Sequence, residues 1–174
     1  GWARRAWVWH EAADTRRFHY IAGQPREGDL VWSGNWGDGE RDRELREYLL
    51  EPARALRLRA RLYGVRYPEA ARRALAEAGA EYGGWLANYE VARAFARFRF
   101  TVHVPRQPYI HALAGIPTIR VFEALACGIP LLCAPWKDCE GLFLPGRDYL
   151  VARNGLQMRR YMRALMNDEG MARE

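Results

Sequence analysis

The stretch TIRVFEALACGIPLL, residues 118–132, decides the fold, because a helix and a strand follow each other within it. Its first part reads as a buried helix that ends at Gly128, a residue type that commonly terminates helices. The run from Ile129 onward is short and apolar, as in a buried strand. A helix leading directly into a buried strand is typical of a parallel α/β sheet. The carboxylate of Glu123 does not fit this apolar helix and requires a separate explanation.

The same alternation extends along the chain. Short apolar segments predict strands at 29–34, 58–65, 80–86, 99–105, 129–135 and 147–152. Amphipathic segments predict helices from about 42, and at 67–79, 88–98, 118–128 and 154–168. We expect Pro52 to kink or split the first helix, Asn88 to cap its helix, and Asn154 to form a capping box with Gln157. The pattern indicates an α/β fold: a Rossmann-like parallel sheet with helices on both faces.

The composition excludes several classes of protein. The 174 residues contain no apolar run of the roughly 18 residues that a membrane span needs, and the start, GWARRAWVWH, lacks the hydrophobic region of a signal peptide. Three cysteines, Cys127, Cys133 and Cys139, predict neither a disulfide framework nor a zinc site, so we expect a cytoplasmic protein. The net charge of +6 comes from arginines dispersed among glutamates, which indicates a solvated surface rather than nucleic-acid binding. No GxGxxG, Walker A or nucleophile-elbow motif occurs.

The first 28 residues do not follow the alternation of strands and helices, and they contain Gly23, Pro25 and Gly28. We interpret 1–28 as the end of a preceding domain and a linker, and 29–174 as one domain. Because the chain starts with Gly1 rather than Met, we expect a processed chain or a fragment.

Ligands of parallel α/β sheets bind beyond the carboxyl ends of the strands, and the loop before residue 118 lies at this rim. Pro117 and Thr118 favour a helix start there, whose free amides attract phosphate, and Arg120 adds positive charge. Two interpretations of Glu123 remain open. Glu123 and Arg120, three residues apart, form a structural ion pair, or the Glu123 carboxylate accepts hydrogen bonds from a vicinal diol such as ribose.

FEALACGIPLL resembles the E-A-x-A-C-G-x-P-V segment of the GT-B glycosyltransferases of group 1, the GT4-like kind. The wider pattern, GNWGDGER … YGVRYP … YGGWL … VHVPRQPY … GIPTIRVFEALACG … PGRDYLVAR, more closely resembles the CgeB-like proteins of the spore-maturation type, over about Trp7 to Asp168. HEAADTRRF resembles the linker that follows the N-terminal domain of GT-B enzymes. The resemblance implies the C-terminal, donor-binding half of a two-domain enzyme, without the N-terminal half and the final helix.

The resemblance also implies roles for individual residues. Glu123 matches the second glutamate of the E-x7-E motif, which binds the donor ribose, whereas Gly115 stands in place of the first glutamate. Thr118, the amides around it and Arg120 would hold the diphosphate, and Arg120 would be catalytic by stabilising the leaving group. The remaining donor contacts would come from Gly34, Asn35 and Trp36, from Gly84, Trp85 and Leu86 at the base, and from Arg66.

The substrates implied are a nucleotide diphosphate sugar and an unknown acceptor (a glycan, protein or small molecule), with no metal and no cofactor. A sugar-nucleotide epimerase and a non-catalytic Rossmann-like binding module remain alternatives. Among the other candidates, we expect His103 to be structural, His111 to be an exposed loop residue, and His10 to face the cleft between the domains. We expect Trp2, Trp7 and Trp9 to pack against the absent domain or against this one.

Overall fold

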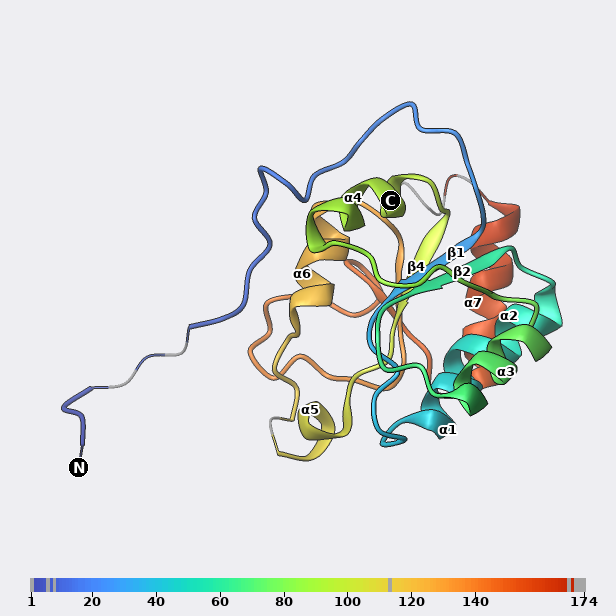
Figure 1. Ribbon diagram of the computed structural model, residues 1–174. Coiled ribbons are helices and arrows are strands. Elements are labelled where there is room, and N and C mark those ends of the chain that lie inside the picture. The colour runs from blue at the N-terminus through green and yellow to red at the C-terminus, as the bar shows by residue number, and fades with distance from the viewer. Residues whose placement is uncertain (1, 6, 8, 113, 169, 171–174) are drawn as a thin grey trace.

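The computed structural model describes residues 2–5, 7, 9–112, 114–168 and 170, and a sheet of parallel strands forms its centre (Figure 1). The strands are β1 (Leu30–Ser33), β2 (Ala60–Tyr63), β3 (Glu81–Tyr82), β4 (Phe100–His103), β5 (Leu131–Cys133) and β6 (Leu150–Val151). Their order across the sheet is β3-β2-β1-β4-β5-β6, and every neighbouring pair is parallel. The chain therefore starts in the middle, runs outward to β3 and crosses back to β4. In such sheets the ligand site lies where the order reverses, here between β1 and β4.

Helices cover both faces of this sheet. They are α1 (Asp42–Leu45), η1 (Arg46–Leu50), α2 (Glu51–Leu56), α3 (Glu69–Glu77), η2 (Asn88–Glu90), α4 (Val91–Ala96), α5 (Gln107–His111), α6 (Ile119–Ala126) and α7 (Gly155–Asn167). Figure 1 shows α2, α3 and α7 on one side of the sheet and α4 and α6 on the other. The predicted α/β architecture is confirmed.

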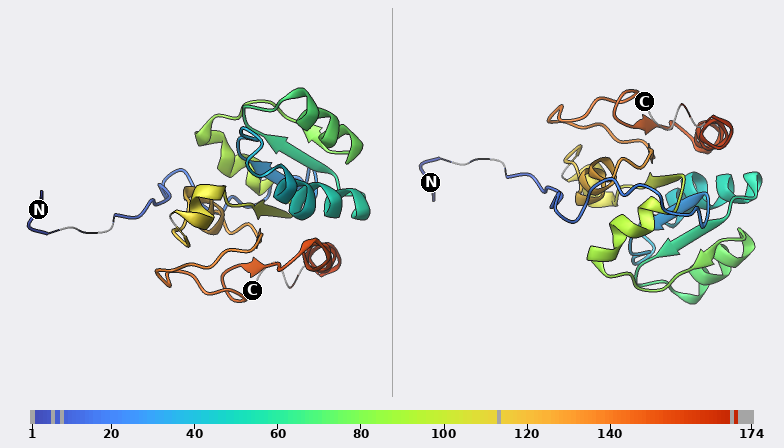
Figure 2. Two further views of the ribbon diagram at one scale, coloured as in Figure 1. Left: turned by 90° about the horizontal axis from the view of Figure 1, so that it is seen from below. Right: turned by 90° about the horizontal axis from the view of Figure 1, so that it is seen from above.

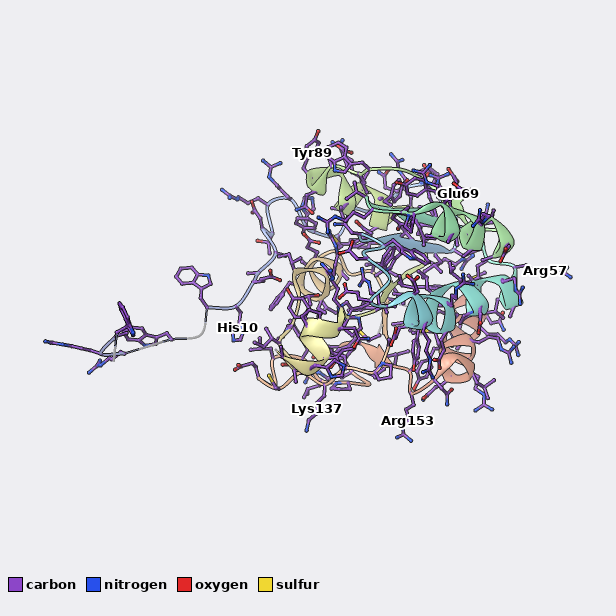
Figure 3. All side chains as sticks on the ribbon, turned by 60° about the horizontal axis from the view of Figure 1, so that its bottom comes forward. His10, Arg57, Glu69, Tyr89, Lys137 and Arg153 are labelled. Atoms are coloured by element: carbon purple, nitrogen blue, oxygen red, sulfur yellow. The ribbon has the colours of Figure 1, made fainter. Side chains whose placement is uncertain are left out.

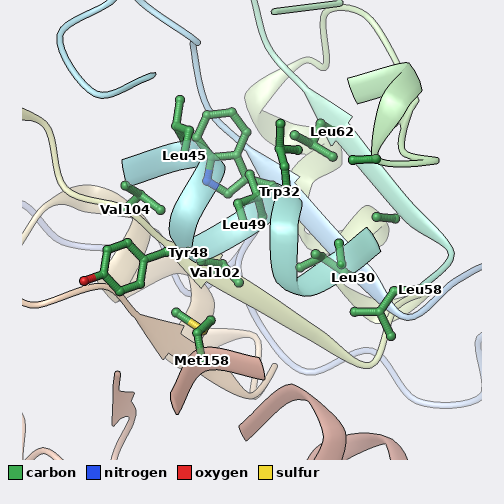
Figure 4. Close-up of a cluster of buried hydrophobic side chains, with 14 of the residues drawn as sticks. Leu30, Trp32, Leu45, Tyr48, Leu49, Leu58, Leu62, Val102, Val104 and Met158 are labelled. Atoms are coloured by element: carbon green, nitrogen blue, oxygen red, sulfur yellow. The ribbon is translucent and has the colours of Figure 1, made fainter. Parts of the chain in front are cut away.

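Alternating side chains of the strands build a core on each face. Leu30 and Trp32 of β1 point into the cluster under α2, α3 and α7, whereas Val31 joins the cluster under α4 and α6. In the first cluster Trp32 and Leu30 lie near Leu49 of η1 and Met158 of α7 (Figure 4). Each fully buried leucine contributes roughly 2 kcal/mol to folding. This two-sided burial explains why the strand segments are nearly continuous in apolar residues.

The first helix is interrupted next to Pro52, where a kink or split is predicted. Arg46–Leu50 form a π-helical turn directly before α2. Proline lacks the amide hydrogen that a regular helix would use at this point, and the wider turn is how the chain accommodates it. The helix ends at Arg57, which adopts a left-handed conformation with φ 52°.

The two predicted asparagine caps have different outcomes. Asn154 caps α7, since its Oδ1 accepts a hydrogen bond from the Gln157 amide at 2.9 Å. The prediction for Asn88 is wrong: the residue lies inside η2, and neither η2 nor α4 has a side-chain cap. The side chain of Asn88 instead acts on the carboxylate of Glu123 and lowers its pKa. A local capping pattern does not reveal this partner, which is distant in the sequence.

The first residues of the segment before β1 project from the body of the fold in both views of Figure 2, whereas its later part packs on the domain, with Phe18 buried in the core under α4 and α6. Trp2, Trp7 and Trp9 on this segment are exposed, so the prediction that these side chains pack against their own domain is wrong. Packing against another domain stays a prediction. His10 lies where the segment reaches the body of the fold (Figure 3), with its Nε2 3.9 Å from Glu140 Oε2. Among the described residues, no helix combines the length and the apolar character that crossing a bilayer requires.

Candidate functional site

A cavity of about 260 Å³ lies at the carboxyl ends of β1 and β4, where the strand order reverses. Its walls come from 32–35, 101–106 and 118–120, together with Glu11, Arg41, Phe95, Tyr109 and Leu131. Four of the residues singled out in the sequence line it: Gly34, Asn35, Thr118 and Arg120. The sheet thus brings together loops that are more than eighty residues apart in the sequence.

The loop after β1 is held in place by neighbouring backbone. The Gly34 amide donates to the Tyr63 carbonyl at 2.9 Å, and Asn35 Oδ1 accepts from the Val65 amide at 3.0 Å. The Trp36 side chain is buried, and its Nε1 donates to Asp42 Oδ1 at 2.6 Å. Any contact of this tryptophan with a ligand would therefore come from its backbone rather than its ring.

Arg41 is a buried cation in the cavity wall that sequence reasoning missed. Its guanidinium donates to the Val104 carbonyl at 2.6 Å and to the Asn35 carbonyl, and it lies 5.3 Å from the centre of the Trp32 ring. Its Nε has no partner in the part of the chain that the structure describes, and no ion pair to a described carboxylate neutralises it. Burial, and then the charge of Arg106, lower the pKa of Arg41 to about 10, so it stays protonated at neutral pH.

Two side-chain pairs tie the loop after β4 to the loop after β1. Arg106 forms an ion pair with Glu40, and Gln107 Nε2 donates to Glu44 Oε1 at 3.1 Å. These contacts fix α5, a helix that the sequence did not predict. His111 at its end is exposed. Among the residues that sequence reasoning missed, Arg106 and Tyr109 follow the carboxyl end of β4, which is the signal that could have found them.

His103 ends β4 and is buried in the cavity wall, as its expected structural role requires. Burial, reinforced by the charges of Arg41 and Arg120, lowers its pKa to about 3, and the imidazole is neutral. Its Nε2 lies 3.1 Å from Thr118 Oγ1, whereas its Nδ1 has no partner among the described residues.

Thr118 precedes α6 in an extended conformation, and its side chain does not cap the helix. Its hydroxyl is engaged with His103 instead. The first amides of a helix lack the regular intrahelical acceptor. In α6 the Val121 amide donates to the Thr118 carbonyl at 3.0 Å, whereas the amides of Ile119 and Arg120 have no partner among the described residues. A helix start of this kind favours an anion.

Arg120 and Glu123 form an ion pair on α6. The Glu123 side chain is only 1% exposed, whereas that of Arg120 is 32% exposed and reaches the cavity. Burial raises the pKa of the Glu123 carboxyl, and Arg120 and the side chain of Asn88 partly offset this rise. The ion pair explains how a carboxylate is tolerated in this apolar helix. It corresponds to the interpretation in which Glu123 and Arg120 form a structural ion pair.

The other singled-out residues lie outside the cavity. Gly84 has φ +75° and accepts a hydrogen bond from the Gly64 amide through its carbonyl, Trp85 is 72% exposed, and Leu86 packs on the core under α4 and α6. Asn88, just after this loop, contacts Glu123, so Glu123 connects the cavity wall with the 84–88 segment. Arg66 is exposed and lies 3.9 Å from Asp38.

A family model described as glycosyl transferase-like matches residues 41–174. Among solved structures, the β-glucosyltransferase of T4 phage, in complex with UDP and Mn²⁺, matches with a TM-score of 0.68 and 14% identity. This match covers 91% of this chain and 45% of the other. Sucrose-phosphate synthase from Thermosynechococcus elongatus matches with a TM-score of 0.71 and 16% identity, over 94% of this chain and 44% of the other.

The chain thus spans less than half the length of these solved structures. At these identities the likeness concerns the fold, and the predicted Rossmann-like domain of the GT-B kind is confirmed. No curated protein sequence matches the chain.

Proposed function

The chain belongs to the glycosyl transferase-like family, and we propose that it is the donor-binding half of a glycosyltransferase that uses a nucleotide diphosphate sugar. Within this family we assign it to the CgeB-like branch, on the motifs in its sequence. One observation carries the proposal: the cavity at the reversal of strand order combines Arg41, Arg106 and Arg120 with the free amides of α6. Such a site suits the two phosphates of a nucleoside diphosphate.

The proposed donor lies along α6. The diphosphate occupies the cavity, near Thr118, Arg120 and the backbone of the loop from Gly34 to Trp36. The ribose hydroxyls bind Glu123, one turn further along the helix, and the base lies toward Gly84, Trp85 and Leu86. The position of Asn88 supports this order, because its side chain acts on the Glu123 carboxylate and the residue belongs to the segment that follows the base loop. Arg66, on the neighbouring rim loop, adds charge for the sugar phosphate.

In the proposed reaction the bond between the sugar and the diphosphate breaks, and the sugar forms a bond to an acceptor hydroxyl or other nucleophile, whose proton passes to a base in the N-terminal half. Arg120 and the amides of α6 stabilise the negative charge that develops on the leaving diphosphate. The donor is a substrate, and the proposal includes neither a metal nor a cofactor. Residues 1–28 would lead from an N-terminal half that binds the acceptor, so we expect this chain alone to bind nucleotide and turn over little.

We further propose a cytoplasmic location, which the free thiols of Cys127, Cys133 and Cys139 support, since reducing compartments keep thiols unpaired. A non-catalytic nucleotide-binding module is the second candidate, and the ion pair between Arg120 and Glu123 favours it. The two candidates share the donor site and differ in turnover of the complete protein.

Calorimetric titration of UDP, GDP and ADP tests the proposal. We expect one of them to bind the wild-type chain, and Glu123→Gln to weaken it by about tenfold or more, because charge-assisted hydrogen bonds to the ribose are lost. Glu77→Gln, at an exposed position of α3, is the matched control and should bind as wild type. Circular dichroism checks that the variants are folded. Absence of binding by all three nucleotides would refute the proposal.

A further inference from the structure

The ion pair on α6 joins the two side chains that the proposed donor needs separately. Arg120 is assigned to the diphosphate and Glu123 to the ribose, yet in the structure each is the partner of the other. Arg120 lines the cavity, whereas Glu123 is almost fully buried and does not. The guanidinium of Arg120 therefore stands between the cavity and the carboxylate.

Neither partner can leave the pair without cost. A buried carboxylate that loses its guanidinium keeps too few hydrogen-bond donors, because Asn88 is the one other side chain among the described residues that acts on Glu123 as a donor. Arg120, in contrast, is one-third exposed and can turn toward the cavity with little desolvation. A diphosphate in the cavity offers Arg120 a new anion, and ribose hydroxyls offer Glu123 new donors.

We propose that Arg120 is a specificity-determining residue, which occupies Glu123 in the free chain and releases it to a ribose only when a diphosphate takes the guanidinium. This inference rests on the proposed function, since it concerns the same site. It explains how one site would select a nucleoside diphosphate over a nucleoside or a phosphate alone. A nucleoside alone breaks the ion pair but offers Arg120 no new anion. A diphosphate alone withdraws Arg120 but offers Glu123 no strong hydrogen-bond donor.

The exchange makes binding of the two parts of the ligand cooperative. Once pyrophosphate has withdrawn Arg120, a nucleoside finds Glu123 free. The coupling is reciprocal, because whichever part of the ligand binds first breaks the ion pair, and the other part then binds without that free-energy cost. A purely structural ion pair, which stays closed in the bound state, gives no such coupling.

The test titrates uridine, guanosine and adenosine into the wild-type chain, alone and with saturating pyrophosphate, followed by NMR chemical shifts. Binding of the intact nucleoside diphosphates serves as the reference. We expect pyrophosphate to tighten binding of the matching nucleoside by about fivefold or more, a typical coupling between linked sites. In Arg120→Met the coupling should disappear, and the nucleoside alone should bind more tightly than to wild type, measured at pH 8 to favour the ionised form of Glu123.

Arg106→Met is the matched control, since Arg106 lines the same cavity but pairs with Glu40. It should weaken pyrophosphate binding and leave the coupling intact. If a nucleoside diphosphate binds while its nucleoside and pyrophosphate bind independently, or the nucleoside fails to bind even with pyrophosphate, the inference is overturned and the proposed function stands. If no nucleoside diphosphate binds, both fall. If Arg120→Met does not fold, the coupling measured in the wild-type chain decides whether the inference holds.

Discussion

His103 makes the stability of the chain depend on pH. Its pKa of about 3 lies well below the ordinary histidine value of roughly 6.5, so unfolding takes up a proton at any pH between the two. The contribution of His103 to stability is therefore present above pH 6.5 and is lost as the pH falls toward 3. Between pH 7 and pH 5 this loss is about 2 kcal/mol.

Urea denaturation of wild type and His103→Gln at both pH values measures this effect. Glutamine cannot titrate, and it keeps a polar group near the position of Nε2 for Thr118. The wild type should lose about 2 kcal/mol more than the variant on acidification. The raised pKa of Glu123 acts in the opposite direction, but it is common to both proteins and cancels in the comparison. An equal loss in both proteins would contradict the assignment.

The sequence located part of the cavity because its motifs follow strand ends. Gly34, Asn35, Thr118 and Arg120 line the cavity for this reason. Arg41 could not be found in the same way, since it lies in a stretch rich in Arg and Glu that reads as an exposed helix. Its burial depends on the carbonyl of Val104, 63 residues further along the chain. Local pattern does not encode such a tertiary partner.

At the scale of elements, the end of β2 approaches the loop after β1 more closely than any side chain permits. Gly64 has φ +144°, and a Cβ at this position would lie 2.0 Å from the Gly34 carbonyl oxygen. We expect Gly64→Ala to destabilise the chain by more than about 3 kcal/mol, from backbone strain and overlap together. Gly79→Ala is the control: its φ is +69°, but no atom lies within 4 Å, so it should cost about 1 kcal/mol. Urea denaturation compares them, and similar costs would exclude steric overlap as the cause.

The strands were predictable and α5 was not, for one physical reason. The strands β1, β4 and β5 are largely apolar runs followed closely by Gly or Pro, and burial on both faces imposes that pattern in the middle of the sheet. The helix α5 has Pro108 in its first turn and no buried residue. Contacts of Arg106 and Gln107 with Glu40 and Glu44 hold it, and these acids lie more than sixty residues earlier. An element that depends on distant partners leaves little periodicity in its own sequence.

At the scale of the whole molecule, Arg41 makes the stability of the folded chain depend on which anions are in solution. A ligand that binds only the folded state raises the free energy of unfolding with its concentration. We expect the melting temperature to be roughly 2–5 °C higher in phosphate than in chloride of equal ionic strength. Arg41→Met should lower the melting temperature and remove most of this difference, and scanning calorimetry in both salts measures both quantities. The same shift in the variant would mean that phosphate acts elsewhere on this chain of net charge +6.

The reversal of strand order between β1 and β4 also bears on how the chain assembles. Strands β1, β2 and β3 follow one another in sequence and in space, so their contacts form over short loops, whereas β4 must return to the open edge of β1. Asn35 and Arg41 belong to the part that closes early, and His103, Thr118 and Arg120 to the part that docks afterwards. A bound donor would contact both the part that closes early and the part that docks afterwards. It would slow unfolding more than it speeds folding, because the contacts it reinforces arise after the first strands have paired.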